Sequence, residues 1–586
     1  MPLTGEQKNY IKKNIWQSSP EDVADYLNIP EKEVLNFLKK RWNPEKYEKY
    51  LSRFSKSSET ETKNFNFNRF FKENWFILAL LSALVAITYL NSLGNAFVSD
   101  DISAISGNPD LGNFSKFVFS APFGFLQRIS YFISFKLGGL TPNFFHLFSI
   151  FIHLGTTLLV FFVLYLIAPR TLAIMAAALF AVHPVLSESV TWISGGSYAQ
   201  GGLFFLASLA AYILAKQKPI FYYISVIAFA LSVSASEKGM VLCAAFLAYE
   251  LALGDIRKNW KKLIPFFAIG IAVAIFLLSK VGGRVSSLQT TYYLAPGMDS
   301  LLVKIPTSIA MYFKLIFWPS EFTLYHTEML FTPWQYRFTI LVFLVYAASI
   351  IYFWRKNKFV SFWLVFFILP LLPTLSPMRI AWAVAERYAY IGVLGILVFI
   401  AWVFFKVSRN KKFQIITFMV FWLVIGGLAM RTIIRNRDWK TEESLWFATA
   451  KTSPSGPNIH NNLGYIYFRK GEYEKAIGEF SLAIKINPAY GDAYHNLGNT
   501  YYQMQKVQEA AQSYHKAIEL NPNLWQSHQN LASIYYNQGW YDLAGEELKK
   551  ALEVNPGSED LKKNMNLIES SKQTVPSPDV NSLFGD

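Results

Sequence analysis

The chain has 586 residues, of which 52% are hydrophobic and 17% aromatic, and its formal net charge is +15. Apolar residues at this share, gathered in long blocks, exclude a soluble globular protein and indicate a polytopic membrane protein with polar ends. Much of the positive charge lies in short loops between the apolar blocks, so it does not indicate binding of nucleic acid. The single cysteine, Cys243, excludes a disulfide within the chain.

Residues 1–60 predict a small cytosolic helical unit. Proline and two acids follow Ser19, which is typical of a helix start, and two short amphipathic segments come after it. The pattern resembles a helix-turn-helix, but a helical cap that reads no DNA explains it equally well and is the preferred interpretation. Residues 61–73 are predicted to be a polar linker.

Eleven apolar segments predict membrane-spanning helices within residues 74–432. They begin near residues 74, 143, 171, 197, 219, 238, 263, 336, 359, 388 and 412. The basic loops and the basic N-terminus fall on one side of this arrangement, which is therefore predicted to be cytosolic. Four basic residues on the other side count against the orientation: Arg431, Arg435, Arg437 and Lys440. The predicted location is a bacterial-type cell membrane, with the C-terminal region outside.

Two adjacent carboxylates, Asp100 and Asp101, directly follow the first apolar segment. Acidic residues at the mouth of a membrane helix usually face a cavity and take part in function. A solvated stop signal that ends the helix explains the pair equally well. The choice between the two interpretations depends on the rest of the chain.

Further polar and aromatic residues gather on the predicted outer side, near the ends of later apolar segments. They are Arg128, His183, Glu188, Trp192, Lys238, Glu386, Arg387 and Tyr388. An interface anchor or an ion pair with a nearby glutamate is the structural alternative for the charged members. His146 and His153 lie seven residues apart in the second span, and packing between helices explains them better than a metal site does. No metal site is predicted, and the use of a divalent metal stays open.

The C-terminal region repeats with a period of 34 residues. The period is marked by Ser453-Pro454, Asn487-Pro488, Asn521-Pro522 and Asn555-Pro556. Small residues and tyrosines recur in matching phases, which is typical of tetratricopeptide (TPR) repeats, each a helical hairpin. Residues 433–570 are therefore predicted to form three stacked TPR repeats, and residues 571–586 a disordered tail.

One phase of the first helix in each repeat is an asparagine: Asn462, Asn496 and Asn530. An amide donates and accepts hydrogen bonds at once, so a row of them suits an extended polypeptide. Repeat consensus, in which each asparagine ties its repeat to the next, explains the same pattern.

Several motifs together resemble those of the integral-membrane GT-C glycosyltransferases and, among them, the TPR-carrying protein O-mannosyltransferases of the TMTC type. The resemblance covers roughly residues 74–560. It rests on Val98-Ser99-Asp100-Asp101, on the stretches 144–147, 179–195 and 435–440, and on Glu386-Arg387-Tyr388 with the two residues after it. Gln127-Arg128-Ile129 departs from the arginine-proline pair usual in the family, and the N-terminal unit and the short repeat array also depart from it.

The resemblance implies an all-α protein: a membrane bundle of the GT-C type, with about 11 spans, followed by a TPR solenoid. It implies an inverting transfer of mannose from a polyprenyl-phosphate donor to Ser/Thr hydroxyls of proteins on the outer face. The lipid and an acceptor polypeptide are then the partners, and no cofactor is defined. Two alternatives stay open: the same enzyme with a lipid or cell-wall glycan as acceptor, and a membrane-anchored TPR scaffold without catalysis.

Within this resemblance, the carboxylates of Asp100 and Asp101 are the candidates for the general base, with Asp100 favoured. The residues implied for the lipid phosphate are Arg128, His183, Lys238 and Arg387. The substrate pocket is implied for Glu188, Trp192, Glu386 and Tyr388. Acceptor binding is predicted for Asn462, Asn496 and Asn530.

Overall fold

The computed structural model describes residues 3–15, 20–27, 29–55, 65–121, 123–279, 300–329, 331–376 and 382–574. All regular elements in these ranges are helices, which confirms the all-α prediction. Contacts divide the chain into two units. One unit is Met1–Glu73 with Leu214–Ile220, and the other is Asn74–Ile213 with Phe221–Asp586.

The first unit contains four short helices: α1 (Gly5–Asn14), α2 (Pro20–Leu27), α3 (Glu31–Arg41) and α4 (Pro44–Ser55). A capping box between Thr4 and Gln7 begins α1. Apolar side chains from all four helices, among them Ile11, Val34 and Tyr50, form one buried core. The helices α2 and α3 correspond to the two amphipathic segments expected from the sequence.

Helices occupy all eleven predicted apolar regions. They are α5 (Phe67–Tyr89), α8 (Pro142–Ile167), α9 (Arg170–Val182) with α10 (Ser187–Thr191), α11 (Gly196–Leu214), α12 (Ile220–Ala235), α13 (Cys243–Ala252), α14 (Ile256–Ser279), α17 (Pro333–Lys356), α18 (Lys358–Ile368), α19 (Val393–Ser408) and α20 (Gln414–Asp438). Among the described residues, six helices are long and apolar enough to cross a membrane, and the pair of α9 and α10, bent by 54°, would be a seventh if it forms one span. The helices α12, α18 and α19 are apolar but shorter. The count of eleven crossings stays a prediction.

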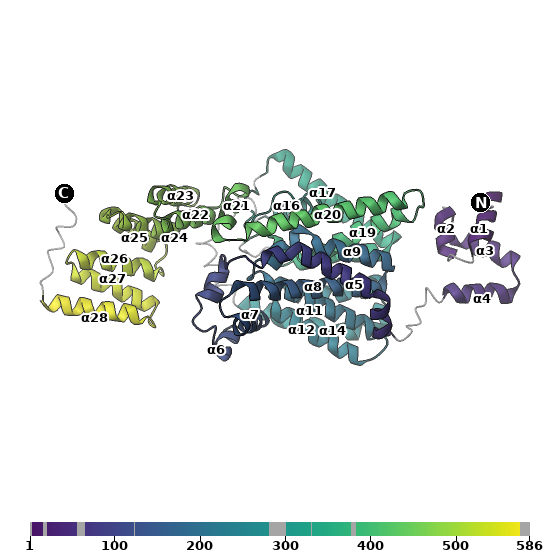
Figure 1. Ribbon diagram of the computed structural model, residues 1–586, viewed down its shortest axis with the longest axis horizontal. Helices are drawn as coiled ribbons and strands as arrows, with labels where there is room; N and C mark the ends of the chain where they lie inside the picture. Colours follow the sequence, from purple (N-terminus) through teal and green to yellow (C-terminus); the bar gives the residue numbers. More distant parts are fainter. Residues whose placement is uncertain are drawn as a thin grey trace. The chain divides into compact units, whose positions relative to one another are not determined.

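The helix α9 forms the centre of the bundle, where it packs against α8, α19 and α20 (Figure 1). It is rich in alanine, and ten of its residues are buried, because small side chains let the neighbouring helices approach closely. His153 on α8 bonds both to the Tyr390 hydroxyl (2.8 Å) and to the Ala181 carbonyl (3.3 Å). These contacts agree with the expected packing role of the histidine.

Shorter elements connect the long helices. The helices among them are α6 (Phe114–Val118), α7 (Phe125–Gly138) and α16 (Leu301–Phe317), and the single turns are η1 (Leu90–Ser92), η2 (Ile102–Ser106), η3 (Pro184–Leu186), η4 (Glu237–Leu242), η5 (Leu369–Leu371) and η6 (Glu386–Ala389). Two domain limits expected from the sequence differ from the helix ends. The helix α5 begins inside the predicted linker, and α20 continues past residue 432 to Asp438.

The repeat region consists of stacked helical hairpins, shown in green to yellow in Figure 1. After α21 (Glu442–Thr452) come the pairs α22 (Pro457–Arg469) and α23 (Tyr473–Ile486), α24 (Gly491–Gln503) and α25 (Val507–Leu520), and α26 (Trp525–Asn537) and α27 (Tyr541–Val554), followed by α28 (Glu559–Thr574). A Cβ atom on Gly464 would lie 2.6 Å from the Phe480 ring, and one on Gly498 would lie 2.7 Å from the Tyr514 ring. Close helix contact therefore explains the small residues of the repeat. The helix α28 ends at Thr574, past the predicted start of the tail, and residues 575–586 lie outside the described ranges.

Candidate functional site

The two carboxylates of the acidic pair lie in different surroundings. Asp101 is fully buried, and its Oδ1 accepts hydrogen bonds from the Ser194 backbone N–H (2.8 Å) and the Ser194 hydroxyl. Its Oδ2 accepts from the Val98 N–H at 3.3 Å. Burial raises the pKa of Asp101 to about 7, although these hydrogen bonds oppose the shift. Asp101 is therefore engaged in holding its loop.

Asp100 is exposed, and the described residues provide no hydrogen bond to its carboxylate. Neighbouring protein still removes part of its hydration, which raises the pKa of Asp100, while the charge of Arg387 lowers it. The two side chains are therefore close enough to interact electrostatically. Of the pair, Asp100 is the carboxylate that is open to a reactant.

The loop that carries Asp100 is held by the end of α20 and the start of α21. The Ala96 N–H donates to the Lys440 carbonyl (3.0 Å), and the Ser99 N–H donates to Oε1 of Glu442 (3.2 Å). Ser99 has a φ of 54°, in the left-handed region that is unfavourable for residues with a Cβ. Such conformations persist where the surroundings fix them, and they are concentrated at functional sites.

Arg387, on the turn η6, forms a buried ion pair with Glu188 of α10. One oxygen of Glu188 accepts from the guanidinium, and the other accepts from the Arg387 backbone N–H at 2.7 Å. The guanidinium lies over two rings, 5.4 Å from the Trp192 centroid and 5.0 Å from the Tyr388 centroid. Glu188, which has no solvent exposure, thus fixes both the backbone and the side chain of Arg387.

The neighbouring residue, Glu386, faces a different set of partners. Its oxygens accept from the Arg435 guanidinium at 3.2 and 3.3 Å, and Oε1 also accepts from the Thr323 N–H at 2.8 Å. Arg435 in turn donates to Asp438 at 3.0 Å. Both Glu386 and Arg435 are fully buried. Adjacent residues of η6 therefore belong to two different buried ion pairs, Arg387–Glu188 and Glu386–Arg435.

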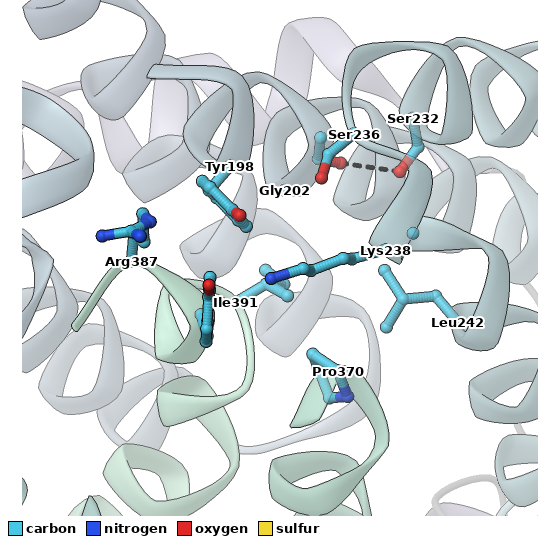
Figure 2. Close-up of a pocket in the computed structure, with 12 residues that line it drawn as sticks. Tyr198, Gly202, Ser232, Ser236, Lys238, Leu242, Pro370, Arg387 and Ile391 are labelled. Atoms are coloured by element: carbon cyan, nitrogen blue, oxygen red, sulfur yellow. Dashed lines mark hydrogen bonds between the residues drawn. The ribbon is translucent and has the colours of Figure 1, made fainter. Parts of the chain in front are cut away.

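A small cavity of about 30 Å³, lined by α11, α12, η4 and η6, lies beside Arg387 (Figure 2). Lys238 extends into it, with Nζ 3.1 Å from the Tyr388 ring centroid and 5.4 Å from that of Tyr198. Figure 2 shows the Lys238 side chain extending across the cavity toward the side on which Arg387 lies. Two cations and two aromatic rings therefore line one cavity, a combination suited to an anion that carries an apolar group.

Arg128 and His183 make contacts of another kind. Arg128 donates to the Val118 carbonyl at 2.9 Å and to the Ala121 carbonyl at 2.5 Å. His183 bonds through Nε2 to the Ile316 carbonyl (3.1 Å), and its Nδ1 accepts from the Val185 N–H (3.3 Å). Neither residue lines the cavity of Figure 2. These contacts favour the structural interpretation, and binding of the lipid phosphate by either residue stays a prediction.

The structure adds two residues that the sequence did not assign to the site. Ser194 supplies two donors to Asp101. Asn436 is fully buried and joins three elements, because its amide donates to the Thr88 carbonyl (2.9 Å) and its oxygen accepts from Ser187 (3.2 Å) and Thr191 (2.9 Å). Both residues lie in stretches that carry the family resemblance, which is the signal that could have identified them.

The three asparagines of the repeats bond mainly within the solenoid. The Asn496 amide donates to Asn461 (2.9 Å) and the Asn530 amide donates to Asn499 (2.8 Å), in each case across a repeat boundary. The Asn462 amide donates to the Asn458 carbonyl (2.7 Å) of its own helix. These bonds favour the role of tying repeats together, and acceptor binding by the asparagines stays a prediction. Among the described residues, no cluster of three or more His, Cys, Asp or Glu side chains could hold a metal ion.

The fold and the site define a polytopic all-α membrane protein with a TPR solenoid next to a site that contains buried carboxylate–guanidinium ion pairs. Family models described as TPR repeat (residues 464–505) and tetratricopeptide repeat (residues 491–524 and 526–558) match the C-terminal region. The chain is 24% identical over 468 residues to Protein O-mannosyl-transferase TMTC3 of Homo sapiens, covering 70% of this chain and 51% of the relative. It is 23% identical over 494 residues to Protein O-mannosyl-transferase TMTC4 of the same organism, covering 68% and 64%.

These matches confirm the predicted resemblance to TPR-carrying protein O-mannosyltransferases of the TMTC type. The chain spans about half the length of the first curated relatives it matches, at 51%. A solved structure titled Crystal structure of MamA matches at 26% identity over 26% of this chain and 85% of that one. Its TM-score of 0.18 adds no argument about the fold.

Proposed function

We propose that this protein is an inverting glycosyltransferase that moves mannose from a polyprenyl-phosphate donor to Ser/Thr hydroxyls of proteins. The observation that carries the proposal is the exposed Asp100 carboxylate, which is electrostatically coupled to Arg387 at the edge of a cavity that also holds Lys238. The proposed base therefore lies within electrostatic reach of Arg387, which shares the cavity with Lys238. The similarity to protein O-mannosyltransferases supports the same reaction.

The carboxylate and the cations have complementary tasks in this reaction. A serine or threonine hydroxyl is a weak nucleophile until a base takes its proton, and the Asp100 carboxylate accepts that proton. The hydroxyl oxygen then forms a bond to the anomeric carbon while the bond from that carbon to the phosphate oxygen breaks. Attack opposite the leaving group inverts the anomeric configuration, and the lipid phosphate leaves with the bonding electron pair.

Arg387 and Lys238 stabilise the charge that develops on the leaving phosphate. Glu188 holds the Arg387 fork in one orientation, so the guanidinium needs little rearrangement during the reaction. The rings of Tyr198 and Tyr388 offer apolar faces beside the cations, suited to the sugar or to the first isoprenoid units. Asp101 and Ser194 position the loop and do not react.

The repeats are proposed to present the acceptor polypeptide. Apolar residues from α21 and α22, including Trp446 and Ile459, form one buried core with Val98 and Trp192. The first hairpin of the solenoid therefore packs directly against the loop of Asp100. A polypeptide bound to the repeats would be tethered near the base, which raises its local concentration toward the mM range, on the order expected for short tethers. In the proposed orientation the N-terminus is cytosolic, and the site and the repeats face outward.

The test is a transfer assay with purified protein, radiolabelled polyprenyl-phosphate mannose and three acceptors: an unfolded Ser/Thr-rich protein, a cell-wall glycan and a lipid. We expect labelling of the protein alone, with inverted anomeric configuration, and loss of labelling in Asp100→Asn. Transfer to the glycan or lipid would replace the acceptor in the proposal. Absence of transfer to every acceptor, with the donor shown to bind, would favour a TPR scaffold.

A further inference from the structure

A second cavity, of about 250 Å³, shares no lining residue with the cavity of Figure 2. Its walls come from α16, residues 321–328, Phe331, the start of α17 and the end of α21. We call it the His326 cavity, after a lining residue whose side chain is only 5% exposed. Neither Asp100 nor Lys238 lines it.

His326 is the feature of this cavity that calls for a ligand. Its Nε2 is buried and has no hydrogen-bond partner among the described residues, and the nearest carboxylate oxygen, on Glu386, is 3.9 Å away. Burial lowers the pKa of His326 to about 3, and the nearby cations Arg435 and Lys314 act in the same direction. The imidazole is therefore neutral. Buried polar atoms are nearly always hydrogen-bonded, so the Nε2 atom suits a partner supplied by a ligand.

The charges around the cavity exclude an anionic ligand. Lys314 is already paired with Glu321 at 2.6 Å, which leaves the carboxylate of Glu328 as an additional negative charge. The remaining polar groups are uncharged hydroxyls and an amide, on Thr323, Thr452, Ser453 and Gln335. A ligand with hydroxyl and amide groups and no negative charge fits this lining, whereas a lipid phosphate does not.

The position of the cavity indicates which neutral ligand it takes. Thr452 and Ser453 stand where α21 leads into the first TPR hairpin, and the Glu328 carboxylate already accepts a peptide N–H, that of Ser455, at 2.8 Å. Two other lining residues lie close to Glu386, the residue adjacent to Arg387. The Thr323 N–H donates to Oε1 of Glu386 at 2.8 Å, and Nε2 of His326 is 3.9 Å from the same oxygen. The cavity thus lies between the repeats and the turn that lines the first cavity.

We propose that the His326 cavity binds an uncharged segment of the acceptor polypeptide, next to the hydroxyl that receives the sugar. The proposal rests on the proposed function. The two cavities then divide the substrates: the phosphate-bearing donor binds beside Arg387, and the polypeptide binds in the cavity whose residues Thr323 and His326 approach Glu386. The imidazole of His326 hydrogen-bonds a backbone or side-chain amide of the bound segment.

Two variants with different chemistry test the cavity in the full-length protein. His326→Phe keeps the ring and removes both nitrogens, and Met311→Trp fills the cavity from the wall of α16 while leaving His326 in place. Phe317→Trp, on the exposed face of the same helix, is the matched control. The probe is a fluorescein-labelled peptide of Ser, Thr, Ala and Asn, with its dissociation constant measured without donor and its KM measured with donor.

We expect His326→Phe to raise both constants about 2- to 10-fold, as loss of one hydrogen bond does. Met311→Trp should raise them further, while the KM for the donor and the constants of Phe317→Trp stay at wild-type values. Unchanged peptide constants in both cavity variants would overturn the proposal. It would also be overturned if the two variants weakened the binding of a neutral oligosaccharide and left the binding of the peptide unchanged. Peptide binding that depends on the cavity, in a wild-type protein that transfers no sugar, would support the cavity and refute the proposed function.

Discussion

The different surroundings of Asp100 and Asp101 predict that two chemically identical substitutions have opposite consequences. Asp100→Asn removes the proposed base but no hydrogen bond found among the described residues, and the residue is exposed. Its effect on the free energy of unfolding should stay within about 0.5 kcal/mol. Loss of a general base lowers the rate by about 10²- to 10⁴-fold, which corresponds to about 2.7–5.4 kcal/mol of transition-state stabilisation.

Asp101→Asn changes a group that accepts three hydrogen bonds. The asparagine oxygen can keep the two bonds from Ser194, but its NH₂ group then faces the Val98 N–H. One buried donor without an acceptor costs about 1–3 kcal/mol. This variant should therefore lose thermal stability, and its remaining activity should follow the fraction of folded protein.

The measurement combines thermal unfolding in detergent with the initial rate of mannose transfer for both variants. Asp110→Asn, which removes a charge from an exposed position of the same connection, is the matched control and should match the wild type in both assays. Full transfer by Asp100→Asn, or a loss of stability equal in the two variants of the pair, would refute the assignment of roles.

Three further predictions concern other parts of the chain. Because the charge of Arg387 lowers the pKa of Asp100, Arg387→Ala should move the acid limb of the pH–rate profile to higher pH. It should also raise the KM for the donor more than Arg387→Lys does. Profiles identical to that of the wild type would show that Arg387 has only a structural role. Burial lowers the pKa of His460 and the hydrogen bond to Glu479 raises it, with the net result that the pKa lies above that of a free histidine. The stability that this pair contributes is therefore fully present below about pH 6.5 and is lost as pH rises through the folded-state pKa of His460. Glu479→Gln should thus lower the unfolding temperature in acid and have little effect in base. A difference in unfolding temperature between variant and wild type that does not change with pH would contradict this. A reporter that is active only outside the cytosol, fused after Asp586, should be active, and an inactive fusion would exclude the proposed orientation.

The sequence by itself determined the elements and the class of protein. Blocks of apolar residues predicted the helices of the bundle, and a 34-residue period predicted the repeats, because both signals are local and recur along the chain. Small residues at Gly464 and Gly498 could be assigned to close helix contacts before the facing rings of Phe480 and Tyr514 were known. The acidic pair and Arg387 were also identified from the motifs alone.

The tertiary structure decided what each of these side chains does. Asp100 and Asp101 are neighbours of the same type, and only the arrival of Ser194, 93 residues along the chain, makes one a buried support and leaves the other open. In the same way, the Ile316 carbonyl, 133 residues along the chain, engages His183, which the sequence could equally place at the donor. Arg128 is engaged by nearer carbonyls, 7 and 10 residues before it. A side chain's type and local spacing determine which bonds it is able to make. Which of them it makes depends on the distant groups that folding brings within hydrogen-bonding distance, and no local pattern records those groups.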